Sequence, residues 1–413
     1  MEEQEQFQKL FDNYAEIALS VGVNVQPGQR MIVQAPVSAA SFVHKLVEKA
    51  YERGVREVYV DYCDEALMRL KYLKQPEEGL GEFPMWKAKG YVEMAENGAA
   101  LLQVYAPNPR LIRDAHPDRV SVVNQTRAAA MRAFKRYAIE DKISWSMVSF
   151  PTRAWAASVF PNLPPSEREG KLWEYIFEVT RVNRQDPIQA WREHVEHLAA
   201  RAAILTEKQY AKLHFTSDKT NLTVELPAEH VWKSAKAVSA AGVSFVPNIP
   251  TEEVFTVPSK RGVNGTVYST RPLNYNGVLI EDFSFTFQGG EVVDFTAAKG
   301  REMLKKLLET DEGARFLGEV AIVPHDSPIS NTGVLFFNTL YDENASCHLA
   351  LGFAIPSGVK GGVNMTRAER EARGLNDSLV HVDFMIGSAN LDIDGERRDG
   401  EREPILRNGR WAF

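Results

Sequence analysis

The sequence predicts an α/β protein with two domains: an amino-terminal open α/β sheet and a carboxyl-terminal mixed, largely antiparallel α+β domain. Three observations support this prediction. The chain has 413 residues, more than a single hydrophobic core usually serves. Its first half alternates strand-like apolar runs with amphipathic helices, which is typical of a parallel sheet covered by helices. After Lys208, short alternating runs indicate hairpins. We expect the domains to span residues 1–200 and 201–413.

The amino-terminal elements predict a β-α-β unit that continues into a larger sheet. Residues 7–21 carry apolar side chains at three- and four-residue spacing, which indicates a helix that Gly22 ends. The unit itself comprises a strand at 31–33, a helix at 41–53 and a strand at 57–61. Further strands are expected at 99–105, 120–123 and 143–149, separated by helical segments such as 128–137. Residues 35–40, which follow the first strand, lack the glycines of a dinucleotide-binding turn.

Two predicted helices, at 167–182 and 188–205, precede the change of pattern. The short runs beyond them predict strands at 213–215, 222–226, 266–268, 278–280, 283–287 and 292–295. Gln288-Gly289-Gly290-Glu291 is the clearest tight turn between two of them. Because this spacing suits hairpins, we expect the second domain to be largely antiparallel.

Charge and cysteine content exclude several classes of function. The net charge is −7, so there is no basic surplus to neutralise nucleic-acid phosphates. Cys63 and Cys347 are the only cysteines, which excludes a disulfide framework and a thiolate zinc cluster and fits a reducing compartment. The amino end is acidic and amphipathic, unlike a signal peptide, and no run approaches the roughly 20 apolar residues of a membrane span. We expect a cytoplasmic protein with neither nucleic-acid nor membrane partners.

Four stretches of the last third place side chains that bind metals in strand-like contexts. The candidate ligands are Glu253, Glu319, His348, His381 and Asp383. Their oxygen and nitrogen atoms suit one or two divalent cations if the side chains converge. His381 and Asp383 lie two apart in a strand pattern, so that both face one side of the sheet. Taken alone, this pair could equally form a simple hydrogen bond on a strand surface.

The other candidates also have alternative interpretations. Glu319 precedes the apolar run 320–323, where an unpaired buried carboxylate would be costly, but an exposed strand end would suit it as well. His348 has small or apolar neighbours, and such a histidine is more often part of a core than a ligand. Glu252 and Glu253 are adjacent and face opposite sides of a strand. The pattern does not choose between them.

Ordered stretches over nearly the whole chain resemble a known family. They occur at 21–28, 186–191, 247–258, 271–277, 328–330, 336–340, 380–387 and 407–409. Through them the chain resembles the dimetal aminopeptidases typified by aminopeptidase T, aminopeptidase S and PepS. The resemblance implies a metallo-aminopeptidase, a hydrolase that removes amino-terminal residues from peptide substrates. It also implies a homodimer.

The resemblance assigns roles to all five candidate residues and selects Glu253 over Glu252. It implies that Glu253, Glu319, His348, His381 and Asp383 hold two divalent metal ions, whether zinc, cobalt, manganese or magnesium. Two such ions would activate a water molecule and polarise the scissile carbonyl. Glu319 or Glu253 would then act as the catalytic general base and acid.

One position departs from the family pattern. The family usually has a tyrosine seven residues after the histidine that matches His348, where this chain has Ile355. An isoleucine can neither coordinate a metal nor donate a hydrogen bond. Two alternative functions therefore remain: a metal-dependent amidase acting on small non-peptide substrates, or a metal-binding relative without catalytic activity.

Overall fold

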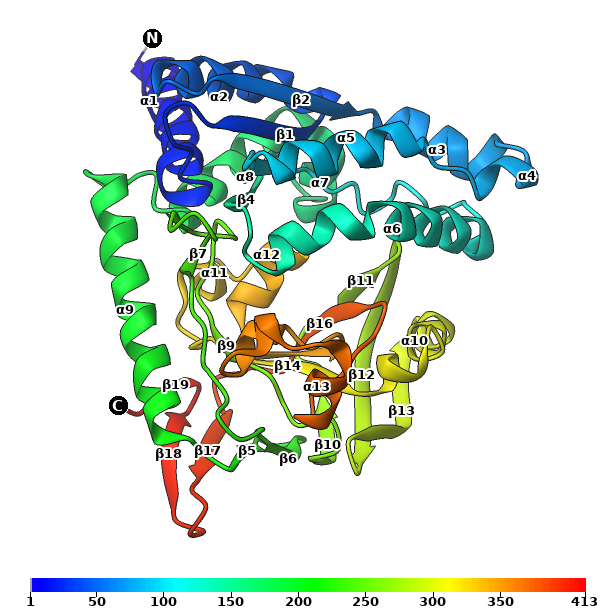
Figure 1. Ribbon diagram of the computed structural model, residues 1–413, viewed down its shortest axis with the longest axis vertical. Coiled ribbons are helices and arrows are strands. Elements are labelled where there is room, and N and C mark those ends of the chain that lie inside the picture. The colour runs from blue at the N-terminus through cyan, green and yellow to red at the C-terminus, as the bar shows by residue number, and fades with distance from the viewer. Residues whose placement is uncertain (1) are drawn as a thin grey trace. The chain divides into compact units, whose positions relative to one another are not determined.

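The computed structural model describes residues 2–413 (Figure 1). The chain divides into two compact units. Unit 1 contains the residues up to His194 together with Lys236–Pro250, and unit 2 contains Val195–Ala235 and Thr251–Phe413. The first crossing falls inside helix α9 (Pro187–Lys208). Within the described residues, no helix combines the length and the apolar character needed to cross a membrane.

Unit 1 is built on a parallel sheet of four strands in the order β2-β1-β3-β4. The strands are β1 (Arg30–Pro36), β2 (Glu57–Cys63), β3 (Ala100–Tyr105) and β4 (Trp145–Ser149). The helices are α1 (Glu2–Ile17), α2 (Ala40–Glu52), α3 (Glu65–Lys74), α4 (Glu77–Leu80), α5 (Met85–Glu96), α6 (Pro117–Ile139), α7 (Arg153–Val159) and α8 (Pro165–Val179). A small hairpin, β7 (Ala237–Val238) and β8 (Ser244–Phe245), completes the unit. The predicted parallel sheet with helical connections is confirmed.

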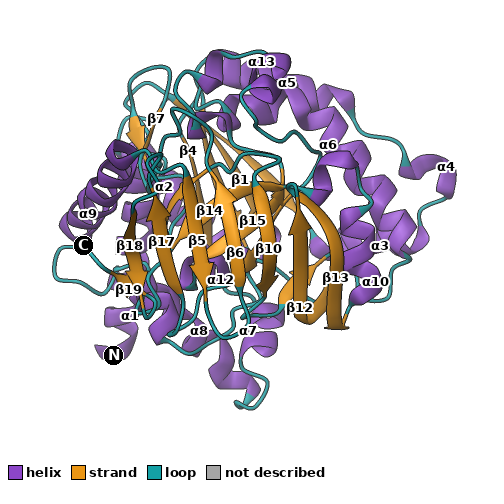
Figure 2. Cartoon of the chain, turned by 90° about the horizontal axis from the view of Figure 1, so that it is seen from below, coloured by secondary structure: helices purple, strands orange, loops and turns teal. Residues whose placement is uncertain are grey.

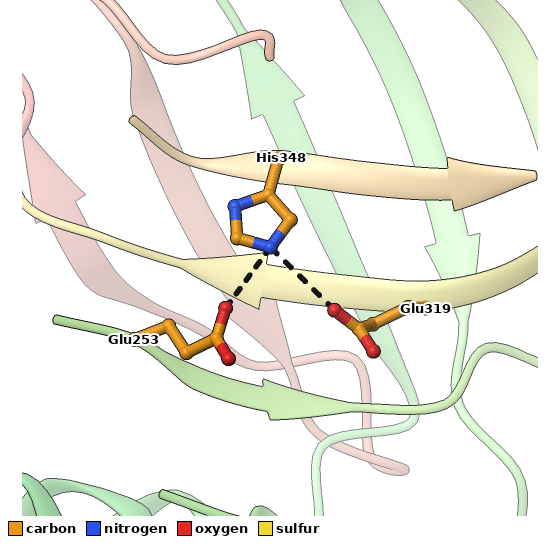
Figure 3. A group of neighbouring side chains, drawn as sticks. All are labelled: Glu253, Glu319 and His348. Carbon is orange, nitrogen blue, oxygen red and sulfur yellow. Dashed lines mark ion pairs between the residues drawn. The ribbon is translucent and has the colours of Figure 1, made fainter. Parts of the chain in front are cut away.

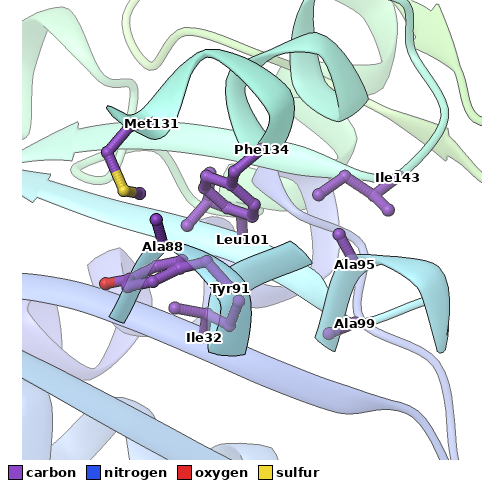
Figure 4. Close-up of a cluster of buried hydrophobic side chains, with 9 residues drawn as sticks. All are labelled: Ile32, Ala88, Tyr91, Ala95, Ala99, Leu101, Met131, Phe134 and Ile143. Carbon is purple, nitrogen blue, oxygen red and sulfur yellow. The ribbon is translucent and has the colours of Figure 1, made fainter. Parts of the chain in front are cut away.

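Apolar residues on both faces of this sheet are covered by helices. On one face, Ile32 and Leu101 of the sheet pack with Tyr91 of α5 and Phe134 of α6, whose rings lie 4.7 Å apart (Figure 4). The other face has an aromatic cluster in which Tyr14 of α1 stacks on Phe42 and meets the edge of Trp173. The Tyr14 hydroxyl also donates a 2.8 Å hydrogen bond to the carbonyl of Ser149. These contacts tie α1 to β4.

One predicted strand is wrong, because residues 120–123 lie within α6. The β-branched run suggested a strand, but helix-start signals precede it. Pro117 occupies the first turn of α6, and the His116 side chain accepts a hydrogen bond from the amide of Asp118. Val120 and Val123 are three residues apart and are both buried against Tyr72 and Leu80. Tertiary packing therefore outweighs the strand preference of valine.

Unit 2 contains a nine-stranded sheet in the order β11-β12-β10-β6-β5-β17-β18-β19, with β13 also pairing with β12 (Figure 2). The strands are β5 (Lys212–Thr216), β6 (Asn221–Glu225), β10 (Val263–Tyr268), β11 (Leu273–Tyr275), β12 (Val278–Gln288), β13 (Glu291–Lys299), β17 (Asp392–Glu396), β18 (Arg402–Arg407) and β19 (Arg410–Trp411). All pairs are antiparallel, as predicted. The runs 278–280 and 283–287 form one strand instead of two, with Asp282 in a left-handed conformation between them.

A second antiparallel sheet of unit 2, in the order β16-β15-β14-β9, carries the candidate site. Its strands are β9 (Val254–Thr256), β14 (Leu317–Ile322), β15 (His348–Gly352) and β16 (His381–Met385). The remaining helices of the unit are α10 (Arg301–Leu308), α11 (Pro328–Asn331), α12 (Thr339–Asp342) and α13 (Arg367–Ala372). Phe384 of β16 packs against Phe283 and Phe285 of β12. This face of the small sheet is therefore apolar and fixed, and the opposite face is left for the polar side chains.

Candidate metal centre

All five candidate ligands meet on one face of the small sheet. His381 and Asp383 are two residues apart on β16, His348 is the first residue of β15, and Glu319 lies within β14. Glu253 directly precedes β9. The convergence that the metal hypothesis requires is therefore present in the structure.

Small residues between the ligands make room for them. Ala350 of β15 is paired with Glu319 on one side and with Asp383 on the other. Gly352 lies opposite His381, and Ala321 lies opposite His348. Directly paired residues in an antiparallel sheet have neighbouring side chains on the same face. The ligands thus project over a floor of alanine and glycine.

A β-bulge sets the position of Glu319. The register between β14 and β15 shifts between Leu317 and Glu319. Gly318 forms this bulge, where a Cβ atom would lie only 2.4 Å from the carbonyl oxygens of Gly352 and Phe353. Only glycine fits such an approach without moving the backbone. The bulge directs the Glu319 side chain into the ligand group.

The five side chains form two groups that share Glu319. Glu253, Glu319 and His348 make up one group, and Glu319, His381 and Asp383 make up the other; in each, one ligand atom from every residue lies within 4.8 Å of the others. His348 Nε2 is 3.0 Å from Glu253 Oε2 and 3.5 Å from Glu319 Oε1 (Figure 3). His381 Nε2 is 3.5 Å from both Glu319 Oε2 and Asp383 Oδ1. The two oxygens of Glu319 therefore face different histidines.

Backbone carbonyls orient both imidazoles. The Nδ1 atom of His348 lies 3.0 Å from the carbonyl oxygen of Ser346, and Nδ1 of His381 lies 2.8 Å from that of Phe353. A carbonyl oxygen can only accept, so Nδ1 carries the proton in both rings. Each Nε2 is then left to face the carboxylates, as in histidines that bind metals.

The buried carboxylates of the cluster favour positive charge on the groups beside them. Burial would lower the pKa of His348, but hydrogen bonds to Glu253 and Glu319 raise it well above the usual value. Burial likewise opposes the charged form of His381, yet Asp383 and Glu319 raise its pKa to about 10. Burial also raises the pKa of Glu319. Protons on the histidines thus compensate a buried excess of carboxylates, a role that divalent cations also fill.

One further acid, Glu343, lies beside the cluster and was not predicted from the sequence. It follows α12 in a short 3₁₀ helix and receives a 3.3 Å hydrogen bond from Asn344. Burial raises the pKa of Glu343 well above its usual value, and the charges of Asp383 and Glu253 raise it further, which places this carboxyl group beside the cluster. Glu343 lies outside any strand, so the strand period that revealed the other ligands could not show it. Its position five residues before His348 was the available signal.

Glu252 and Ile355 lie outside both ligand groups. The amide of Glu252 donates a 2.8 Å hydrogen bond to the Asn344 side chain, which fixes the segment before β9 and turns Glu253 toward His348. Ile355 is half-buried three residues beyond β15.

Comparisons with known proteins identify the family of the chain. The model of the thermophilic metalloprotease family M29 matches residues 7–411. Aminopeptidase 2 of Geobacillus stearothermophilus is 52% identical over 407 residues, covering 98% of each chain. Aminopeptidase T of Thermus aquaticus is 42% identical, covering 98% of this chain and 99% of its own.

A solved structure extends the likeness to three dimensions. Wild-type AmpT from Thermus thermophilus superposes with a TM-score of 0.93 at 40% identity, covering 98% of this chain and all of its own. This agreement includes both the α/β unit and the antiparallel unit with its ligand-bearing sheet. The chain therefore belongs to the thermophilic metalloprotease family M29, and it is a metal-dependent aminopeptidase.

Proposed function

We propose that the cluster would hold two divalent cations, with Glu319 contributing to both sites. The observation that carries this proposal is the orientation of Glu319, whose Oε1 faces His348 and whose Oε2 faces His381. Glu253 and His348 would complete one site, and His381 and Asp383 the other. Glu343 adds a further carboxylate beside them.

The donor set fits such ions. It consists of carboxylate oxygens and imidazole Nε2 atoms, which suit zinc, cobalt, manganese or magnesium. Both imidazoles are anchored through Nδ1, which directs Nε2 toward the carboxylates. When bound, such cations would polarise a carbonyl group and lower the pKa of a nearby water molecule.

The residues of the chain move the proton. If Glu319 uses both oxygens to hold the cations, Glu253 is the carboxylate that would accept the proton of the attacking water and pass it to the leaving amine. Glu343 is suited to hold the positive α-ammonium group of a peptide, which would restrict cleavage to the amino-terminal residue.

The decisive experiment is metal analysis of the purified protein together with an activity assay. We expect about two divalent ions per chain after dialysis against zinc, cobalt, manganese or magnesium. Aminoacyl anilides and short peptides should be hydrolysed only by the metal-loaded protein. A single ion per chain at saturation would contradict the contribution of Glu319 to both sites.

Ile355 supports a second candidate function, the hydrolysis of simple amides. The site lacks the tyrosine hydroxyl that the family usually supplies at this position, and such a donor stabilises the developing oxyanion. Parallel assays with aminoacyl anilides and simple amides separate the two functions. Activity on simple amides alone would reject the peptidase assignment, and bound metal without turnover on either would indicate a non-catalytic relative.

We further propose a cytoplasmic homodimer acting on peptides, on the basis of the family resemblance. Light scattering on the purified protein tests the assembly. A mass of about 93 kDa, twice the 46.4 kDa of the chain, is expected.

Gly318→Ala should weaken the centre without removing a ligand. The added methyl group would press on the carbonyls of Gly352 and Phe353 and move Glu319. Because small displacements of catalytic groups are costly, we expect kcat/KM to fall roughly ten- to a hundredfold. Steady-state kinetics would measure this loss. Gly170→Ala is the matched control, since a Cβ there meets no atom within 4 Å, and it should leave the rate unchanged; equal rates for both variants would show that the bulge does not position Glu319.

A further inference from the structure

Unit 2 contains a pocket next to the metal cluster that the proposed mechanism does not use. Its volume is about 310 Å³. Arg271, His325 and Ser388 contribute polar groups to its lining, and Ala345 and Ser346 form part of its wall. A pocket of this size could hold one amino-acid side chain or one end of a short peptide.

The pocket and the metal cluster share a segment of backbone. The carbonyl oxygen of Ser346 accepts the hydrogen bond that orients His348. Gly387, which also lines the pocket, donates a 2.9 Å hydrogen bond from its amide to the carbonyl of Cys347, the residue between Ser346 and His348. Ser346 lies two residues from His348, a separation of about 7 Å in an extended chain. The pocket wall therefore lies within about the length of two extended residues from His348.

Arg271 brings an unneutralised charge to this pocket. Its guanidinium is half-buried and donates one 3.3 Å hydrogen bond, to the carbonyl of Val334. No carboxylate within residues 2–413 forms an ion pair with it. Four of the five guanidinium N–H groups are therefore available, and burying such a charge is costly unless a partner anion arrives.

The nearest acid does not neutralise Arg271 directly. Asp342 is close enough for its charge to be felt by Arg271. Its Oδ1 accepts the amide of Phe336 at 2.8 Å, however, and its Oδ2 accepts the amide of Asn338 at 3.0 Å. Asp342 is thus committed to the loop before α12. The guanidinium remains free to form a charge-assisted pair with a ligand.

We propose that this pocket receives a carboxylate of the peptide substrate, with Arg271 as its binding partner. The carboxylate has two sources: an acidic side chain near the amino terminus, or the free carboxyl end of a short peptide. Either would pair with the guanidinium in a bidentate manner. The proposal rests on the proposed metal centre, since it places the scissile bond beside His348.

Two matched substrate pairs test the proposal and distinguish the sources. Glu-p-nitroanilide is compared with Gln-p-nitroanilide, and the dipeptide Leu-Gly with Leu-Gly amide. The wild type should favour the acidic member of one pair by roughly ten- to a hundredfold in kcat/KM, mainly through KM, as expected for a hydrogen-bonded ion pair. A preference in the anilide pair identifies an acidic side chain as the source, and a preference in the dipeptide pair identifies the free carboxyl end. Arg271→Gln should reduce this preference to near unity and leave the neutral member within about threefold. Arg271→Lys should retain part of it.

Arg370→Gln is the control. Arg370 is also half-buried and donates to backbone carbonyls, those of Gly362 and Val363, but it does not line the pocket. This variant should keep the wild-type preference. A wild type that shows no preference within either pair, or an Arg271→Gln variant that keeps it, would overturn the proposal. An equal loss on all four substrates would also overturn it, because Arg271 would then have only a structural role.

A binding measurement distinguishes failure of the pocket proposal from failure of the proposed metal centre. D-Leu-Gly and its amide, and the D-residue anilides, serve as uncleaved probes in calorimetric titrations of the metal-loaded protein. The acidic member of the preferred pair should bind at least about tenfold more tightly to wild type than to Arg271→Gln. Equal affinities would reject the pocket assignment even if turnover fails for another reason. Loss of turnover with this affinity difference intact would instead implicate the metal ligands.

Discussion

Glu319→Gln is expected to lower kcat/KM on aminoacyl anilides by on the order of a thousandfold or more. Glu319 is the only side chain that belongs to both ligand groups, so its replacement affects both proposed metal sites. Glutamine keeps the size of the side chain but provides one neutral oxygen in place of a shared negative charge. Metal content should fall together with the rate, from about two ions per chain toward one or none. Mass spectrometry of the metals and steady-state kinetics measure the two losses.

Glu403→Gln provides the matched control for this substitution. Glu403 lies in β18 and is hydrogen-bonded to Lys208 and Tyr210 rather than to the ligand cluster. We expect its replacement to leave metal content and kcat/KM within about threefold of wild type, as for changes away from the site. If Glu319→Gln retains both ions and the wild-type rate, the assignment of Glu319 to both sites is wrong.

Removal of the metals should abolish activity and destabilise the protein at the same time. Without cations, the buried carboxylates of the cluster are compensated only by protons on the histidines. A ligand present at a hundred times its dissociation constant stabilises the native state by about 2.7 kcal/mol per site. With two such sites in a unit of this size, we expect chelation to lower Tm by roughly 10 to 20 °C. Differential scanning calorimetry before and after chelation measures the shift.

The Glu319→Gln variant tests the origin of this shift. Because that variant should bind few ions, chelation should change its Tm by no more than about 2 °C. Restoring zinc, cobalt, manganese or magnesium to the chelated wild type should restore both Tm and turnover. A wild type that keeps its activity after complete loss of metal would contradict the metal-dependent mechanism.

The strands that build the site could be predicted because their side-chain period is simple. Alternation placed His381 and Asp383 on one face of a strand, and β16 has that arrangement. Alternation could not choose between Glu252 and Glu253. In the structure, the hydrogen bond from the Glu252 amide to Asn344 and the approach of Glu253 to His348 distinguish them. Both features depend on residues distant in sequence, which a local pattern cannot show.

Other features escaped prediction because they depend on tertiary structure. Glu343 lies in a short 3₁₀ helix, where no period links it to the ligands. Val120 and Val123 favour strands locally but are buried on one side of α6. The return of 236–250 to unit 1 is carried by contacts such as the 2.8 Å hydrogen bond from the Ser146 hydroxyl to the carbonyl of Val246. No turn or composition signal in the sequence indicates that the chain returns from unit 2 to unit 1 at these residues.

The anchoring of both imidazoles by backbone carbonyls has a consequence for metal exchange. The rings of His348 and His381 are held by Ser346 and Phe353 of the folded chain, not by a metal. The backbone therefore orients both imidazoles, and we expect metal exchange to leave their orientation unchanged. Since affinity for nitrogen and oxygen donors rises in a fixed order along the divalent transition metals, we expect the bound ion to depend on local metal supply as well as on the donor set.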